Sequence, residues 1–190
     1  LGDVYKRQEA DGNIHSIAGT NFDWDKGDGG LAVGACLLDT AAVAHDDAGN
    51  TFIGTGVGRI RRIDVATGII DTVAGIGLPG YTGAGGPADK AKIGRPAALF
   101  LMADGGFYFA DNKCHVIRHV DADGIITTVA GCGEKGFSKD GTPALEARLG
   151  GRGMRHLRRF HVNGGGVDEK CPRVRCAHYT AVSYTHLTLP

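Results

Sequence analysis

Three glycines at residues 75, 77 and 80 have the spacing of a turn that binds the pyrophosphate of a dinucleotide. That chemistry needs a helix directly after the turn, because the phosphate lies against the free N–H groups at the helix N-terminus. The stretch that follows, YTGAGGPADKAKIGRP, contains four further glycines and two prolines. Glycine costs about 1 kcal/mol and proline about 3 kcal/mol inside a helix. We therefore expect no long helix here and no dinucleotide or other cofactor.

A second candidate is the stretch NFDWDKGDGG, in which Asp23, Asp25 and Asp28 could supply oxygen ligands to calcium. A calcium loop places a glycine at its sixth position and a bidentate acid at its twelfth. Counted from Asp23, the sixth residue is Asp28 and the twelfth is Gly34. The spacing therefore predicts a solvated acidic loop without a metal.

Histidine and cysteine residues offer two further candidate centres. His115 and His119 belong to one expected strand, so we interpret them as surface or structural residues. Cys171, Cys176 and His178 resemble half of a zinc site, but the second pair of ligands is missing at the standard spacing. The five cysteines form an odd set, which argues against a disulfide framework. We expect no metal site, and the sequence singles out no catalytic residue.

A basic stretch at Arg59, Arg61 and Arg62 could contact nucleic acid. Alternation along a strand would place Arg59 and Arg61 on one face and Arg62 on the other, which divides the patch. Residues 1–150 carry 14 Lys and Arg against 19 Asp and Glu, whereas residues 151–190 carry 7 against 2. An acidic body repels phosphate. We expect a solvated strand face paired with aspartates, and no nucleic-acid partner.

The elements that would position these residues follow a period of about 56 residues. Gly19, Gly75 and Gly131 are separated by 56 residues each, and the stretches DTVAGIGLPG and TTVAGCGEKG repeat one design. A fixed period near 50 residues indicates a repeat architecture, in which each unit buries its apolar face against its neighbours. The glycines that suggested a phosphate turn are therefore repeat positions.

The pattern of each full unit predicts four short antiparallel strands rich in β-branched and aromatic residues. Asp104-Gly105 and Asp123-Gly124 stand where the chain must reverse direction. The expected strands cover residues 41–45, 51–54, 59–64 and 69–74 in one unit, and 97–102, 106–110, 116–121 and 125–130 in the next. The predicted class is all-β, a partial propeller of four-stranded antiparallel blades.

The stretches GRIRRIDVATGIIDTVAG and HVIRHVDADGIITTVAG resemble NHL repeats, in particular the bacterial type with a long loop such as GYTGAGGPA between blades. The resemblance covers about residues 11–150, and it implies a β-propeller of about six blades when complete. The expected organisation is about two and a half blades over residues 9–150. Gly54-Thr55 departs from the Ala-Asp pair found at residues 110–111.

Both ends are set apart from this organisation. The opening LGDVYKRQ, residues 1–8, and the closing VSYTHLTLP resemble translated sequencing adapters. The repeat pattern stops near Gly150, so we interpret residues 151–190 as an out-of-frame or disordered tail. No apolar run reaches the length that spans a bilayer. The sequence leaves the cellular compartment of the protein undecided, and an extracytoplasmic compartment is among the alternatives.

The favoured hypothesis is a non-catalytic binding module that recognises a protein or carbohydrate partner through loops on a rigid scaffold. The candidate interaction residues lie in the long loops and the short turns: Asp23, Trp24, Asp25, Tyr81, Asn112, His115 and Phe137. The alternative is a fragment of a lactonase- or lyase-like propeller enzyme with its active site in other blades. Inward-facing acids or histidines on the first strands would favour the enzyme, and His45 is the only one expected there.

Overall fold

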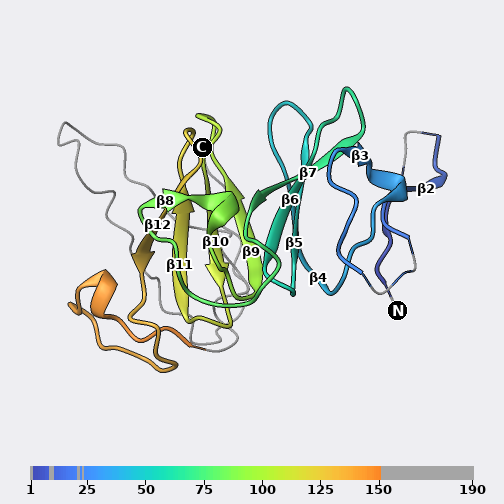
Figure 1. Ribbon diagram of the computed structural model, residues 1–190. Helices are drawn as coiled ribbons and strands as arrows, with labels where there is room; N and C mark the ends of the chain where they lie inside the picture. Colours follow the sequence, from blue (N-terminus) through green and yellow to red (C-terminus); the bar gives the residue numbers. More distant parts are fainter. Residues whose placement is uncertain (1, 9–10, 21, 23, 151–190) are drawn as a thin grey trace.

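The computed structural model describes residues 2–8, 11–20, 22 and 24–150, and these residues are almost entirely β-structure (Figure 1). All ladders between named strands are antiparallel, which confirms the expected all-β class. Within the described ranges the only helices are three single 3₁₀ turns: η1 Ala32–Gly34, η2 Ala88–Lys90 and η3 Ala144–Glu146. No helix in these ranges is long and apolar enough to cross a membrane.

Two five-stranded sheets stand side by side and do not close into a barrel or ring (Figure 1). The first sheet has the order β3-β7-β6-β5-β4. Its strands are β3 Gly30–Leu31, β4 Thr40–His45, β5 Thr51–Thr55, β6 Arg59–Ile63 and β7 Ile69–Ala74. The second sheet has the order β8-β12-β11-β10-β9. Its strands are β8 Gly86–Pro87, β9 Pro96–Leu101, β10 Phe107–Asp111, β11 Val116–Val120 and β12 Ile125–Ala130.

The expected strands are confirmed with boundary shifts of about one residue, and strands at equivalent places are offset by 56 or 57 residues. The expected number of four strands per sheet is wrong by one, because β3 and β8 each add a two-residue strand. These short strands cover the outer edges of β7 and β12. They satisfy backbone groups that an uncovered edge would leave open.

The core between neighbouring units repeats position by position. One cluster lies between the first and second sheets and contains Ala74, Ala88, Ala91, Ile93 and Ile126. The preceding cluster uses the residues 56 positions earlier, which are Ala18, Ala32, Ala35, Leu37 and Ile70. The turns η1 and η2 therefore each pack an alanine, Ala32 or Ala88, against the strand before the turn and the sheet after it. Burial of one unit against the next is what the 56-residue period predicts.

A two-stranded sheet precedes the first five-stranded one. It pairs β1 Tyr5–Gln8 with β2 Ile14–Ala18, and β2 is equivalent to β7 and β12. The sequence reasoning left residues 1–8 outside the fold, so β1 is an element that it did not anticipate. Residues 151–190, interpreted as a tail, lie outside the described residues.

Candidate functional site

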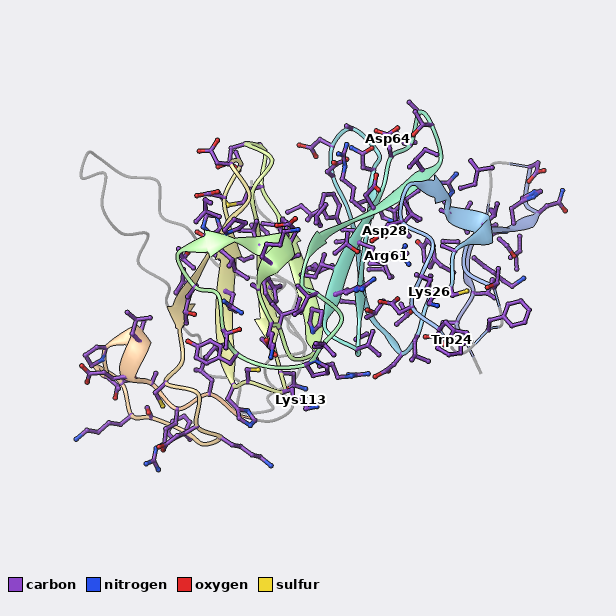
Figure 2. All side chains as sticks on the ribbon, in the orientation of Figure 1. Trp24, Lys26, Asp28, Arg61, Asp64 and Lys113 are labelled. Atoms are coloured by element: carbon purple, nitrogen blue, oxygen red, sulfur yellow. The ribbon has the colours of Figure 1, made fainter. Side chains whose placement is uncertain are left out.

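The three long inter-sheet loops start at Gly19, Gly75 and Gly131, and the second and third start beside the short turns 56–58 and 112–115. The Gly77 N–H donates to the carbonyl of Gly58 at 3.3 Å, and the Cys114 thiol donates to the carbonyl of Gly80 at 3.3 Å. Figure 2 shows Trp24 and Lys113 toward one end of the molecule and Asp64 at the opposite one. We call the end with Trp24 and Lys113 the loop face.

Glycine begins each inter-sheet loop because the loop passes very close to a neighbouring backbone. Gly19, Gly75 and Gly131 have φ values of 96°, 87° and 100°. Their N–H groups donate to the carbonyls of the alanines that begin η1, η2 and η3, at 3.0, 2.8 and 2.8 Å. A Cβ atom on Gly75 would lie 2.9 Å from side-chain carbons of Ile93 and still closer to a backbone carbonyl. The repeated glycine is therefore a packing requirement, not a phosphate site.

One buried arginine in each five-stranded sheet holds the preceding loop in place. Arg61 is fully buried and donates from Nη1 to the carbonyls of Lys26 and Cys36, both at 3.1 Å. Arg118 is also fully buried and donates to the carbonyls of Thr82 at 3.3 Å and Lys92 at 3.0 Å. The accepting residues in the two sheets are 56 positions apart. A solvated strand face paired with aspartates was expected around Arg61. The pairing is found, with Asp25 and Asp28, but the expected solvation is wrong because the loop covers the strand.

The acidic loop is likewise only partly solvated, which corrects the expectation for Asp25. The Asp25 side chain is 8% exposed, and its carboxylate lies 3.6 Å from Arg59 Nε and 3.8 Å from Arg61 Nη1. Burial raises the pKa of the Asp25 carboxyl, and the two guanidinium groups partly offset that rise. Asp25 therefore belongs to a buried ion network and is not displayed for a partner.

The aromatic candidates are displayed on the loop face. Trp24 is 63% exposed, with the Lys26 ammonium 4.8 Å from the centre of its ring (Figure 2). Phe137 is 65% exposed, and Tyr81, at the equivalent position of the preceding loop, is 45% exposed. The Tyr81 hydroxyl bonds the Thr128 hydroxyl at 3.0 Å, which fixes the outer end of its ring. These three rings are the accessible part of the predicted set, and Asp23 lies outside the described residues.

The remaining two candidates lie in the turn between β10 and β11, and both are partly buried. The Asn112 N–H donates to the carbonyl of Arg95 at 3.0 Å. His115 precedes β11, has φ +56°, and has a buried Nδ1. The expectation that His115 lies in the same strand as His119 is therefore wrong.

The same turn depends on Asp111, a fully buried carboxylate that the sequence reasoning did not select as a site residue. It accepts hydrogen bonds from the N–H groups of Gly94 at 2.6 Å, Arg95 at 3.0 Å and Cys114 at 3.2 Å. Burial raises the pKa of the Cys114 thiol to about 12, and the Asp111 charge adds to the rise. The thiol therefore stays protonated at neutral pH and is a poor nucleophile.

An ion pair joins the starts of the first strands of the two sheets. Asp39 and Arg95 occupy equivalent positions, directly before β4 and β9. Arg95 donates from Nη2 at 2.7 Å and from Nε at 3.1 Å to the two Asp39 oxygens. This bond lowers the pKa of the Asp39 carboxyl and raises that of Arg95. The sequence offered no sign of this pair. Asp39 and Arg95 stand at the same repeat position, and the repeat pattern does not indicate that residues at equivalent positions contact each other.

A shallow groove of about 450 Å³ opens beside the second inter-sheet loop. Its lining includes Tyr81, Ala84 and Gly85 from the loop, Thr127 and Thr128 from β12, and Cys132 just after β12. Within the described part of the chain, no group of three or more His, Cys, Asp or Glu side chains is arranged to hold a metal ion.

Comparison with known proteins gives a structural likeness only. No protein-family model matches the chain, and no curated protein matches it. A crystal structure of a structural genomics protein of unknown function from Bacteroides thetaiotaomicron is similar with a TM-score of 0.50 and 18% sequence identity. The match covers 74% of this chain and 33% of that chain, so this chain spans about a third of the solved one. At this identity the likeness shows the all-β fold alone.

Proposed function

We propose that this chain is part of an NHL-type β-propeller, with about two and a half blades in residues 9–150, and that its loop face binds a protein or carbohydrate partner without catalysis. The observation that carries this proposal is the exposure of Trp24, Tyr81 and Phe137, one ring in each of the three inter-sheet loops. Aromatic rings offer a large contact area at a low cost in conformational entropy. The buried arginines Arg61 and Arg118 hold the supporting loops in one conformation, which lowers the entropic cost of binding.

Tryptophan fluorescence tests the proposal directly, because Trp24 is the only tryptophan in the chain. Binding partners are first selected on an oligosaccharide array and a peptide library. The selected ligand is then titrated while the emission of Trp24 is recorded. A saturable spectral shift is the expected result.

Variants then locate the binding surface. Phe137→Ala should weaken binding about tenfold or more, since exposed aromatic anchors dominate interface energies. Val65→Ala is the matched control, because Val65 is also exposed, at 55%, but lies next to Asp64 at the end opposite the loop face. Equal affinities for the two variants would contradict a loop-face site.

The competing hypothesis, a lactonase- or lyase-like propeller enzyme, places the active site in blades beyond this chain. It predicts that ligand selection on this chain returns nothing that shifts the Trp24 emission. It also predicts that Phe137→Ala leaves the turnover of the complete ring unchanged.

A further inference from the structure

The two buried arginines differ in the acidic groups around them. Arg61 lies beside Asp25 and Asp28, whereas the residues 56 positions later are Tyr81 and Ala84. In the first sheet, the Asp28 carboxylate accepts hydrogen bonds from Arg61 Nε at 3.0 Å and Nη2 at 2.6 Å. Its other oxygen accepts a hydrogen bond from the Thr72 hydroxyl at 2.7 Å, and Thr72 pairs with Arg61 across the strands. Figure 2 shows the Asp28 and Arg61 side chains together over the first sheet. Asp28 thus bonds the Nε and Nη2 of Arg61, and Asp25 lies 3.8 Å from its Nη1.

The second sheet repeats this strand pairing without these two acids, and its own buried acid, Asp111, stands where the first sheet has Thr55. Arg118 pairs with Thr128 across the strands, as Arg61 pairs with Thr72. The residue 56 positions after Asp28 is Ala84, which has no side-chain acceptor, whereas the third loop has Asp140 at this position. An aspartate therefore stands at this position in two of the three loops.

The backbone around Ala84 matches the backbone around Asp28. Each residue lies between two glycines with positive φ, at 104° and 78° around Asp28 and at 85° and 84° around Ala84. The Gly29 N–H donates to the carbonyl of Ile70 at 2.9 Å, and the Gly85 N–H donates to the carbonyl of Ile126 at 2.7 Å. The loss of the acid is therefore a change of side chain on an unchanged scaffold.

The loss of that acid leaves Arg118 incompletely bonded. Arg118 is fully buried, and no carboxylate among the described residues lies within salt-bridge distance of it; burial lowers its pKa, and the charge of the buried Asp111 partly offsets that from farther away. Its Nε has no hydrogen-bond partner. The ring of Tyr81 lies over the guanidinium, 5.3 Å from its carbon to the ring centre, and the Tyr81 hydroxyl takes the Thr128 hydroxyl as partner. A buried cation with an unpaired donor is costly unless an anion pairs with it.

Tyr81, Ala84 and Thr128 line the groove described above, and Arg118 lies beneath the Tyr81 ring rather than in the groove wall. We propose that the groove binds a carboxylate group, with Arg118 Nε and the Thr128 hydroxyl as its donors, in the place that Asp28 takes in the first sheet. Entry of the carboxylate requires that the hydrogen bond between the Tyr81 and Thr128 hydroxyls breaks and that the Tyr81 ring turns aside. The carboxylate belongs either to a small free acid or to an acidic side chain of a peptide.

The proposal does not depend on partner binding through Trp24 and Phe137. It is tested on the whole chain by following the Arg118 Nε–H signal in ¹⁵N–¹H spectra. Sodium acetate is added in exchange for sodium chloride so that screening stays constant. We expect a saturable shift with acetate and at least about tenfold weaker binding of acetamide, since charge-assisted hydrogen bonds are about twice as strong as neutral ones.

A peptide arm separates the two sources of the carboxylate. A glutamate-containing peptide and its glutamine twin are titrated under the same conditions. If the peptide binds much more tightly than acetate, the carboxylate belongs to a peptide partner. If the two bind alike, the site takes a small free acid.

Ala84→Asp is the decisive variant, because it adds the missing carboxylate without removing any group. It should shift the Arg118 Nε–H signal in the absence of ligand and reduce the response to acetate at least about tenfold. Trp24→Ala should leave the acetate response unchanged, which separates this site from the loop-face function. Absence of any saturable acetate shift in the unmodified chain, or an equal shift in Ala84→Asp, would overturn the proposal.

Discussion

Replacement of Gly75 by alanine tests how the inter-sheet loops are held against the sheets. Gly75 has φ +87°, and a Cβ atom there would lie 2.9 Å from carbons of Ile93 and still closer to the carbonyl oxygen of Gly58. The left-handed conformation alone costs a residue with a Cβ about 1–2 kcal/mol. Forced overpacking adds about 1–3 kcal/mol. We therefore expect Gly75→Ala to lower the free energy of unfolding by about 2–5 kcal/mol.

Gly124→Ala is the matched control. Gly124 has φ +78°, but no atom lies within 4 Å of the added Cβ. It should therefore show only the conformational cost of about 1–2 kcal/mol. Urea unfolding followed by circular dichroism measures both variants. The spread of neutral surface substitutions is about 0.5 kcal/mol. If Gly75→Ala and Gly124→Ala lower the free energy of unfolding by amounts that agree within this spread, close packing is not the reason for the glycine at residue 75.

Three further predictions concern buried charge and reactivity. Arg61→Met should lower the free energy of unfolding by about 3–5 kcal/mol, because it leaves the buried partners of Arg61 unpaired. Arg62→Met should lower it by at most about 1 kcal/mol in the same urea assay, since the Arg62–Asp64 pair is exposed. The pKa of Asp39 is lowered in the fold, so its contribution to stability is present above the unfolded pKa and is lost as pH falls through the folded one. Asp39→Asn should therefore lower the melting temperature at pH 7 and flatten its decline below about pH 5. Iodoacetamide at pH 7.5, about one unit below an ordinary thiol pKa, should alkylate the exposed Cys132 much faster than Cys114, as mass spectrometry would show.

The internal repeat makes the second inter-sheet loop informative. Its backbone follows the first loop closely, so the exchange of Asp28 for Ala84 is a natural substitution on a constant scaffold. The first sheet thus shows a carboxylate bonded to the Nε of its buried arginine, a bond that the Nε of Arg118 lacks. A carboxylate site is inferred from this difference rather than from the groove alone.

The sequence by itself determined the strands and their period. The strands follow from alternating β-branched residues and turn glycines, which are local features that local conformational preference decides. Their period follows from the recurrence of Gly19, Gly75 and Gly131 along the chain. The exclusion of a helix after Gly80 also needed only glycine and proline energetics. Strand boundaries were therefore correct to about one residue.

Only the tertiary structure decided which polar side chains are buried. Asp25 and Arg61, or Tyr81 and Arg118, are distant in sequence and meet because a loop folds back over the sheet that follows it. Asp39 and Arg95 meet because stacking of the two sheets brings equivalent strands side by side. Sequence patterns report the preference of a residue for its own backbone conformation. Desolvation and pairing of charges depend on which segments stack, and stacking is set by the whole core.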